Sequence, residues 1–539
     1  MVIKTVVVVF LFALILGLLS FAVSKETGLM FHAVSGNVGN ELTETMVIDW
    51  NRTYTRGGAF DEARSVVQTS DGGYALAGES GWHEDDSFWL VKTDYDGNIM
   101  WDKTYRGASF GAEAFSLVIS DDGGFAIGGY SWRAGQNHIW LVKTDANGNM
   151  LWNKTYGGDG DDRAYFMIKT SDGGYALAGY TTSFGAGSAD GYLIKTDPEG
   201  NIVWNRTYGG GNWDDLWCVV QTSDGGFALA GEISSYGAGG MDFWLVKTDG
   251  TGEEQWNHTY GGMGRDWASS VVQTSDGGYA LAGETDSFGP STDVWLLKTD
   301  ASGNVQWNRT YGRDLQDGAT ALTLSSLGRY VLAGYESFPA TGKDLWLAEI
   351  DADGTILCDV TCAGPGWDQA LSVIQDSGGG YVAAGFWKPS SDPLAHSNFY
   401  LVRARVAIQL TASISPMSAS VLVGQPMAFT LTVSGGYAPY SYQWYLDGNP
   451  VSGATSNSWT FTPTTSGIYF VYLKVTDSAN NTTQSETARI TVASVPVGGY
   501  SFQIEGHTTA KPLTPYLTLI AVLVIGFIFV RRKRVKDTK

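Results

Sequence analysis

Tryptophans flanked by charged or amide side chains are the residues of this sequence best suited to recognise a ligand. They stand in segments that differ from one another, such as GWHEDD, SWRAG, GNWDD and FWKP. Planar rings beside polar groups stack on sugar rings or anchor a protein partner. Burial at the joints between structural units is the alternative for each of them. The ligand-binding candidates are Trp82, His83, Trp132, Arg133, Trp213, Trp267, Trp367 and Trp387.

Signals for catalysis are few. The six histidines are scattered, and the chain contains no HExxH or CxxC motif. Carboxylates are plentiful, but most of them recur at fixed repeat positions, so no pair stands out as an acid and base couple. No catalytic residue is therefore assigned, and a binding role is favoured over an enzymatic one.

These candidates belong to one unit that is written seven times, and its cleanest copy begins WNHTYGG at Trp256. Copies follow at spacings of 51 or 52 residues, and each contains a turn such as SDGGY or SDGGF. A fixed period of this length indicates a repeat architecture. The anchor positions are Trp50, Trp101, Trp152, Trp204, Trp256, Trp307 and, in the seventh copy, Cys358.

Each unit reads as four short strands separated by turns rich in Gly, Asp and Asn. Four strands in about 40–50 residues are typical of a propeller blade. The last copy supplies three strands, whereas residues 47–54 precede the first copy without a partner. Pairing 47–54 with 399–406 would complete the seventh blade and remove two exposed edges. The sequence thus predicts an all-β, seven-bladed β-propeller over residues 46–408.

Positions shared by all blades are expected to be scaffold. The Trp and Tyr of WNxTY lie on one face of a strand and are predicted to pack between neighbouring blades. A repeated aspartate is predicted to cap a loop rather than to catalyse. The turn DYDGN (94–98) is similar to the opening of a calcium loop, but its sibling turns lose the second acid. A plain hairpin turn is favoured over a metal site, so no metal or other cofactor is assigned. Calcium is the only cofactor for which this turn gives any indication. The repeated aspartates are Asp61, Asp162, Asp214, Asp266, Asp317 and Asp368.

N-x-T sequons recur on the strand predicted to be outermost in each blade, where glycans would cover the sheet edges. The alternative to glycosylation is that Asn and Thr are simply tolerated on a solvent-exposed edge strand. The candidate acceptors are Asn51, Asn153, Asn205, Asn257, Asn308, Asn480 and Asn481. Cys358 and Cys362 are four residues apart on one strand, about 13 Å, which is too far for a disulfide.

The two ends of the chain indicate a surface location. Residues 1–24 combine Lys4, an apolar run and a small-residue cleavage candidate, as in a secretory signal; an uncleaved anchor is the alternative. Residues 25–45 are a polar leader. Residues 513–530 are an uncharged apolar run followed by the basic tail 531–539, which places the C-terminus in the cytoplasm if the run spans a membrane. The net charge of −21 argues against nucleic acid as a partner.

Residues 409–493 lose the repeat and show period-2 alternation with more Ser, Thr and Pro. They read as about seven strands of a sandwich, with Trp444 as the buried core tryptophan and Tyr469 as a corner tyrosine. Residues 494–512, rich in Gly, Pro and Thr, form a linker to the apolar run.

The repeats, through TYGG, a Gly-rich turn and an aromatic-Gly strand in this order, resemble the SBBP-type seven-bladed propeller repeats of secreted and cell-surface proteins. YQWYLDG and GIYFVYLKVTD resemble PKD-type immunoglobulin-like domains, which usually act as spacers or adhesive modules. The resemblance implies fold and location. The leading hypothesis is a membrane-anchored binding or adhesion protein of the cell surface, with glycans or proteins as partners. The alternative is an extracellular hydrolase or lyase that acts on polysaccharide.

Overall fold

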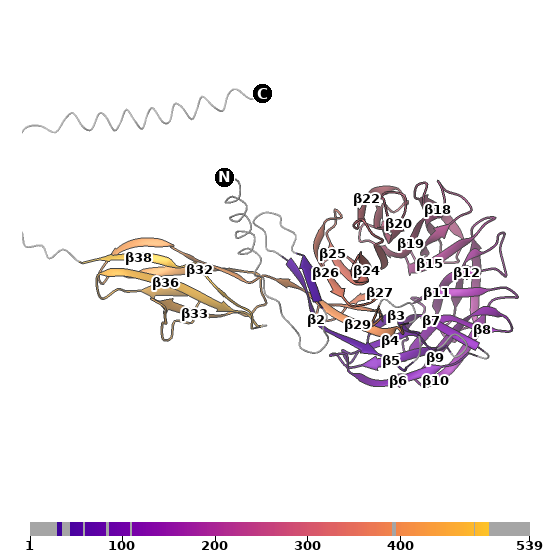
Figure 1. Ribbon diagram of the computed structural model, residues 1–539, viewed down its shortest axis with the longest axis horizontal. Coiled ribbons are helices and arrows are strands. Elements are labelled where there is room, and N and C mark those ends of the chain that lie inside the picture. The colour runs from indigo at the N-terminus through magenta and orange to yellow at the C-terminus, as the bar shows by residue number, and fades with distance from the viewer. Residues whose placement is uncertain are drawn as a thin grey trace, which may run out of the picture. The chain divides into compact units, whose positions relative to one another are not determined.

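The computed structural model describes residues 30–34, 44–57, 60–81, 86–107, 110–390, 395–478 and 480–494 (Figure 1). Every regular element among them is a β-strand, so the chain is all-β over this part. The predicted signal, span and basic tail lie outside the described residues, as do most of the leader and nearly all of the linker. In the described part, no helix has the length and hydropathy to cross a membrane.

Seven antiparallel sheets follow one another along residues 44–408, and each combines three strands of one copy of the repeat with the WNxTY strand, or its equivalent, of another copy. Sheet 1 consists of β3 (Phe60–Gln68), β4 (Tyr74–Gly81), β5 (Ser87–Thr93) and β6 (Ile99–Tyr105). Sheet 2 consists of β7 (Phe110–Ile119), β8 (Phe125–Arg133), β9 (Gln136–Thr144) and β10 (Met150–Tyr156). Sheet 3 consists of β11 (Asp162–Lys169), β12 (Tyr175–Thr181), β13 (Asp190–Thr196) and β14 (Ile202–Tyr208). Sheet 4 consists of β15 (Asp214–Gln221), β16 (Phe227–Ile233), β17 (Asp242–Thr248) and β18 (Glu254–Tyr260).

Sheets 5 to 7 complete the series. Sheet 5 is β19 (Asp266–Gln273), β20 (Tyr279–Thr285), β21 (Asp293–Thr299), β22 (Val305–Tyr311). Sheet 6 is β23 (Gly318–Leu324), β24 (Tyr330–Phe338), β25 (Gly342–Ile350), β26 (Ile356–Ala363), with β1 (Met30–Val34) added beyond β26. Sheet 7 is β27 (Asp368–Gln375), β28 (Tyr381–Trp387), β29 (Asn398–Ile408) and the N-terminal β2 (Glu44–Tyr54).

The pairing of β2 with β29 joins the two ends of the repeat region. Val47 lies opposite Arg405, and Tyr54 lies opposite Phe399. The predicted pairing of 47–54 with 399–406 is therefore confirmed. It gives the last repeat its fourth strand and protects the edge of β29.

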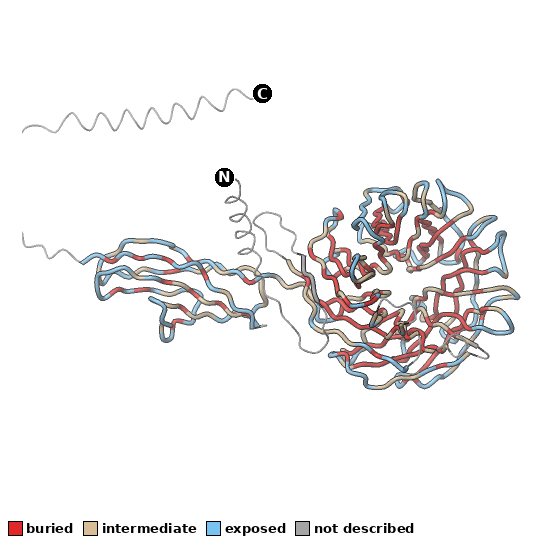
Figure 2. Tube along the Cα trace, viewed as in Figure 1, coloured by how far each residue is buried: buried red, intermediate tan, exposed pale blue. Residues whose placement is uncertain are grey.

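The sheets pack on one another in chain order, and sheet 7 packs back on sheet 1 (Figure 1). The first strands of successive sheets contact each other all the way round, so β3, β7, β11, β15, β19, β23 and β27 form an inner ring. Apolar side chains fill the space between neighbouring sheets, where Figure 2 shows continuous buried chain. At the junction of sheets 7 and 1, Leu401 of β29 and Leu76 of β4 belong to one buried cluster.

The WNxTY residues connect neighbouring sheets, as predicted. Trp204 of sheet 3 packs edge-on against Phe227 of sheet 4, with ring centroids 5.7 Å apart. Tyr208 donates its hydroxyl proton to the Gly252 carbonyl of sheet 4 at 2.7 Å. Equivalent bonds to the next sheet are made by Tyr54, Tyr105, Tyr156, Tyr260 and Tyr311.

The repeated aspartates cap loops, which confirms their predicted role. Asp266 Oδ2 accepts a hydrogen bond from the Gly262 backbone N–H at 2.9 Å and another from the Ser287 hydroxyl at 2.7 Å. In the DYDGN turn, both carboxylate oxygens of Asp94 accept hydrogen bonds from Asn98. This carboxylate is therefore satisfied within its own hairpin.

The chain divides into two compact units. One comprises residues 1–413, 432–441 and 474–484, and the other 414–431, 442–473 and 485–539. After residue 409 the strands form a three-stranded and a six-stranded sheet: β30 (Thr411–Ser415), β32 (Met427–Ser434), β35 (Ser458–Phe461), and β31 (Ser418–Leu422), β38 (Ala488–Ala493), β36 (Gly467–Thr476), β33 (Ser441–Leu446), β34 (Asn449–Pro450), β37 (Thr482–Gln484).

Two residues of the second unit behave as predicted. Trp444 is fully buried and lies 5.8 Å from Phe429 between ring centroids. Tyr469 donates its hydroxyl proton to the Thr465 carbonyl at 2.9 Å, four residues upstream, which is the bond expected of a corner tyrosine. The three cysteines, Cys218, Cys358 and Cys362, are buried and unpaired.

Candidate functional site

The first strand of every repeat sheet carries a β-bulge at the same position. In β11, for example, Ala164 pairs with Gly179 and Phe166 pairs with Ala178, which leaves Tyr165 without a cross-strand partner. A bulge re-aims the side chain of the extra residue and is over-represented next to functional sites. The bulged residues are Arg64, Phe115, Tyr165, Trp217, Ser269, Thr320 and Leu371.

Two further positions accompany each bulge. One is two residues earlier on the same strand, and the other is its direct partner on the second strand, as with Asp215 and Glu232. Because the first strands form the inner ring, these side chains gather around one region. We call the following residues the central cluster: Glu62, Arg64, Glu79, Glu113, Phe115, Tyr130, Arg163, Tyr165, Tyr180, Asp215, Trp217, Glu232, Trp267 and Glu284.

Aromatic rings form a continuous row in the cluster. Tyr165 stacks on Trp217 with centroids 4.1 Å apart and an interplanar angle of 9°. Phe115 meets Tyr165 edge to face at 5.2 Å. All three side chains are half-buried, so each ring keeps part of its surface open to solvent. The row thus offers apolar planar surface contributed by three neighbouring sheets.

Guanidinium groups lie over the aromatic rings. Arg64 lies 4.6 Å from the Phe115 centroid, and Arg163 lies 4.5 Å from the Tyr130 centroid. Arg64 also forms an ion pair with Glu79 at 2.8 Å. A cation over a ring face is attracted by the ring quadrupole, so these contacts hold both partners in place.

Burial alters the acids of the cluster. It raises the pKa of Glu79, an effect that Arg64 opposes only in part. It also raises the pKa of Asp215 to about 7 and that of Glu284 to about 7. Within the described structure, Asp215 Oδ1 is buried and has no hydrogen-bond partner. A carboxyl group that is protonated near neutral pH can donate as well as accept, which suits a ligand rich in hydroxyl groups.

Three carboxylates meet beside Arg64. One oxygen each of Glu79, Asp86 and Glu113 lies within 4.8 Å of the others. Such a group can hold a hard cation, or it can divide acid and base roles between its members.

The residues predicted from the sequence fall at different places. Trp267 belongs to the central cluster, where Arg265 lies 4.6 Å from its ring. Trp213 is 38% exposed and packs 5.1 Å from Tyr180, so it borders the cluster. Trp132 and Arg133 end β8, whereas Trp82 and His83 lie outside the described residues.

The last two predicted tryptophans lie near the junctions of sheet 6. Trp367 is 48% exposed and stands over Gly342, where a Cβ atom would meet its indole. Trp387 is half-buried against the apolar cluster shared by sheets 6 and 7. The structure therefore brings Trp213 and Trp267 toward a common region and leaves these two apart from it.

Arg133 lines a separate pocket of about 520 Å³ on sheet 2. Two further cations, Arg106 and Lys154, line it with Trp140 and the sequon residue Asn153, whereas none of the described lining residues is acidic. In a chain with a net charge of −21, this local excess of positive charge favours an anionic group. The remaining lining residues are Ser131 and Thr155.

The sequons Asn51, Asn153, Asn205, Asn257 and Asn308 all stand on edge strands, namely β2, β10, β14, β18 and β22, as predicted. The bulge residues of the central cluster, which were not predicted from the sequence, lie instead on the inner strands. The signal was present: at the bulge position, the repeats read Arg, Phe, Tyr, Trp, Ser, Thr and Leu between repeated small and apolar residues.

No family model matches this chain. A decoration protein of Escherichia phage T5 is 38% identical over 85 residues, which are 15% of this chain and 51% of the relative. The highly immunogenic outer capsid protein of Enterobacteria phage T4 is 38% identical over 61 residues, which are 11% of this chain and 16% of the relative. The chain thus spans about half, or less, of the length of the curated relatives it matches.

Among solved structures, Sqt1 from Chaetomium thermophilum has a TM-score of 0.38 at 11% identity, over 83% of this chain and 100% of that chain. The extracellular domain of a hybrid two-component system from B. thetaiotaomicron has a TM-score of 0.28 at 12% identity, over 80% and 68%. β-1,2-Mannobiose phosphorylase from Listeria innocua has a TM-score of 0.29 at 10% identity, over 66% and 90%. Likenesses at these scores say nothing about what this chain binds.

Proposed function

We propose that the chain is a cell-surface protein that binds glycans through the central cluster of a seven-bladed β-propeller. Support for the propeller comes from seven repeat sheets packed in succession, with the last against the first. The PKD-type sandwich and the membrane anchor at 513–530 complete the proposed arrangement, with the ectodomain outside the cell. They rest on the sequence pattern of 409–530.

The observation that carries the binding role is the aromatic row of Phe115, Tyr165 and Trp217. Sugar rings present apolar C–H faces that stack on aromatic rings, and their hydroxyl groups need donors and acceptors at the edge. Arg163 and Asp215 supply both kinds of group next to the row. The row is built on strands, which hold it in a fixed geometry.

A glycan-array screen of the full-length chain, followed by calorimetric titration of the hits, tests the proposal. Tyr165→Ala and Trp217→Ala are expected to weaken binding about 5- to 150-fold, because each removes stacking surface worth about 1–3 kcal/mol. Ser269→Ala changes the equivalent bulge position on sheet 5 and is the matched control. Unchanged affinity in both aromatic variants would refute this site.

A second candidate function, hydrolysis or lyase cleavage of polysaccharide, is favoured by the three carboxylates beside Arg64. Carboxyl groups at such short distances from one another can act as a pair in which one donates a proton and another abstracts one. Turnover of the glycans that bind would be measured for the wild type and for Glu113→Gln. Turnover lost with binding retained would establish the enzyme; binding without turnover in the wild type would exclude it for those glycans.

A further inference from the structure

Buried aspartates from neighbouring sheets meet at four of the seven junctions. The repeated aspartate at or directly before the start of a first strand faces a second aspartate, which lies within the first three residues of the third strand of the preceding sheet. All eight side chains are at most 8% exposed. The pairs are Asp190 with Asp214, Asp242 with Asp266, Asp293 with Asp317, and Asp344 with Asp368.

A glycine of the TYGG loop, or its equivalent, lies against both carboxylates, so that a side chain at this position would clash with them. At Gly209, the point where a Cβ atom would stand is 2.5 Å from Asp214 Oδ2 and 3.1 Å from Asp190 Oδ1. At Gly312, the same point is 2.5 Å from Asp293 Oδ1 and 2.9 Å from Asp317 Oδ2. Gly261 lies in the same way between Asp242 Oδ1 and Asp266 Oδ2. One oxygen of each acid thus lies against the same glycine.

Several of these oxygens have no protein partner. Among the described residues, Asp242 Oδ1, Asp293 Oδ1 and Asp368 Oδ2 are buried and accept no hydrogen bond. The first two are the oxygens that lie against Gly261 and Gly312, and Asp368 Oδ2 lies in the same way against Gly364. A buried carboxylate oxygen without a donor costs free energy, and a second carboxylate beside it adds repulsion.

The other three junctions lack the second acid. At the position equivalent to Asp242, two residues before the aromatic residue of the third strand, the chain has Ser87, His138 and Asn398. The facing first strands there supply Ala112, Asp162 and Asp61. Paired acids are therefore not a requirement of this sheet packing, and their presence at four junctions needs its own cause.

We propose that each of the four paired junctions binds one divalent cation, calcium, between adjacent sheets. Two carboxylates bring a charge of −2, which balances the ion. The donors are all oxygen, the ligand type that calcium prefers, with six to eight ligands at 2.3–2.6 Å. Water and backbone carbonyls of the glycine loops would supply the remaining ligands. The ion would neutralise the repulsion and fasten sheets 3 to 7 to one another.

The test is calcium binding by the full-length chain after chelator treatment, measured by equilibrium dialysis with radioactive calcium. Asp242→Asn is expected to lose one bound ion per chain relative to the wild type. Asp162→Asn, at a junction with a single acid, is the matched control and should keep the wild-type number. Because the comparison is a difference of one ion, ions bound elsewhere on the chain do not affect it.

Thermal unfolding gives an independent readout. Calcium should raise the Tm of the wild type, and in chelator Asp242→Asn should melt above the wild type because one of two like charges is gone. If Asp242→Asn does not fold, Asp293→Asn repeats both measurements at another junction. No binding by the wild type at millimolar calcium, or equal numbers of ions in wild type and variant, would overturn the proposal. A Tm that rises on acidification but not with calcium would also overturn it, in favour of a shared proton.

Discussion

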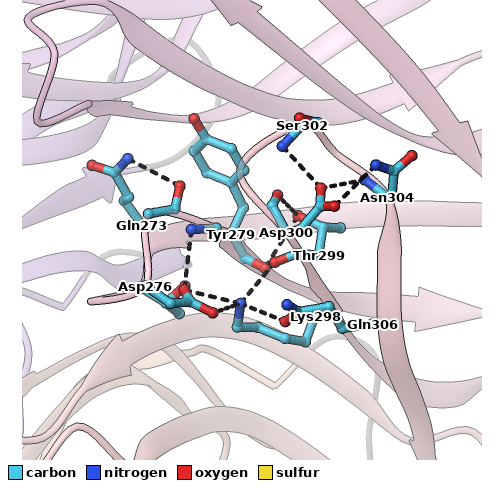
Figure 3. A network of polar contacts seen from close by, with 12 residues as sticks. Gln273, Asp276, Tyr279, Lys298, Thr299, Asp300, Ser302, Asn304 and Gln306 are labelled. Carbon is cyan, nitrogen blue, oxygen red and sulfur yellow. Dashed lines mark hydrogen bonds and ion pairs between the residues drawn. The ribbon is translucent and has the colours of Figure 1, made fainter.

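Lys298 Nζ lies 2.9 Å from Asp276 Oδ2, and this contact ties the turn between β19 and β20 to the end of β21 (Figure 3). The ammonium group also donates to the Thr299 carbonyl at 2.7 Å and to Gln306 Oε1 at 3.0 Å. The Lys298 side chain is only 6% exposed, whereas that of Asp276 is 50% exposed. The same pair recurs as Lys92–Asp71, Lys143–Asp122, Lys195–Asp172 and Lys247–Asp224.

Unequal exposure predicts unequal effects of breaking this pair. Asp276→Asn leaves a buried ammonium with neutral partners and is expected to cost about 3 kcal/mol. Lys298→Met leaves a carboxylate that water can reach, so about 1–2 kcal/mol is expected. Calorimetric Tm values of the two variants check this order, with the exposed-turn variant Ser302→Ala as control. Equal losses would contradict it.

Glu284 should make the protein less stable as pH rises. Its pKa is raised by burial from 4.5 to about 7, and its Oε2 accepts from the Tyr335 hydroxyl at 2.9 Å. The folded state then holds a proton that the unfolded state releases, so stability is greatest below pH 4.5 and falls between pH 4.5 and 7. Glu284→Gln should raise stability at pH 8 by about 2 kcal/mol and change it little at pH 4.

Denaturation of wild type and Glu284→Gln across this pH range measures the difference. Glu254→Gln, on the exposed edge strand β18, serves as the control for loss of one negative charge. A constant difference between Glu284→Gln and wild type at all pH values would contradict the assignment.

Tyr208→Phe removes one bond between sheets 3 and 4 without changing the ring. The Gly252 carbonyl loses its donor, so a loss of about 1 kcal/mol is expected, seen as a lower Tm. Tyr95→Phe alters a tyrosine that is 42% exposed and should leave the Tm unchanged. If the two variants behave alike, the bond between sheets contributes nothing measurable.

Deletion of residues 44–54 removes β2 and exposes the edge of β29. An unpaired strand edge recruits another strand, so the deleted chain is expected to form dimers or larger species in light scattering and to unfold at a lower temperature. Asn51→Ser keeps the strand and is the control. A monomer of unchanged Tm would show that the pairing of β2 is dispensable.

Much of the fold followed from the sequence because it depends on local pattern. The recurring WNxTY and SDGG segments fixed the number of sheets, and the unpaired residues 47–54 pointed to their partner at 399–406. The capping role of the repeated aspartates was predicted on the same grounds and is seen at Asp266.

The sequence predicted the candidate site less well than it predicted the fold. The site was expected among the segments that vary between copies, yet Tyr165 and Trp217 belong to the repeated first strands. They stand at a β-bulge, and no turn-forming residue marks the position of this bulge in the sequence. Trp213 and Trp267 were found from their unusual flanking residues, and they do lie at the central cluster.

By itself, the sequence determined the repeat, the strand content and the way the two ends of the repeat region pair, because these features arise from residues close together or in register along the chain. Only the tertiary structure decided which side chains from different repeats meet. Asp242 and Asp266 read as two ordinary repeat positions 24 residues apart, and packing of sheet 4 on sheet 5 places both carboxylates beside Gly261. The sites that we propose lie between copies of the repeat, and the pattern within one copy does not show which residues of two copies will meet.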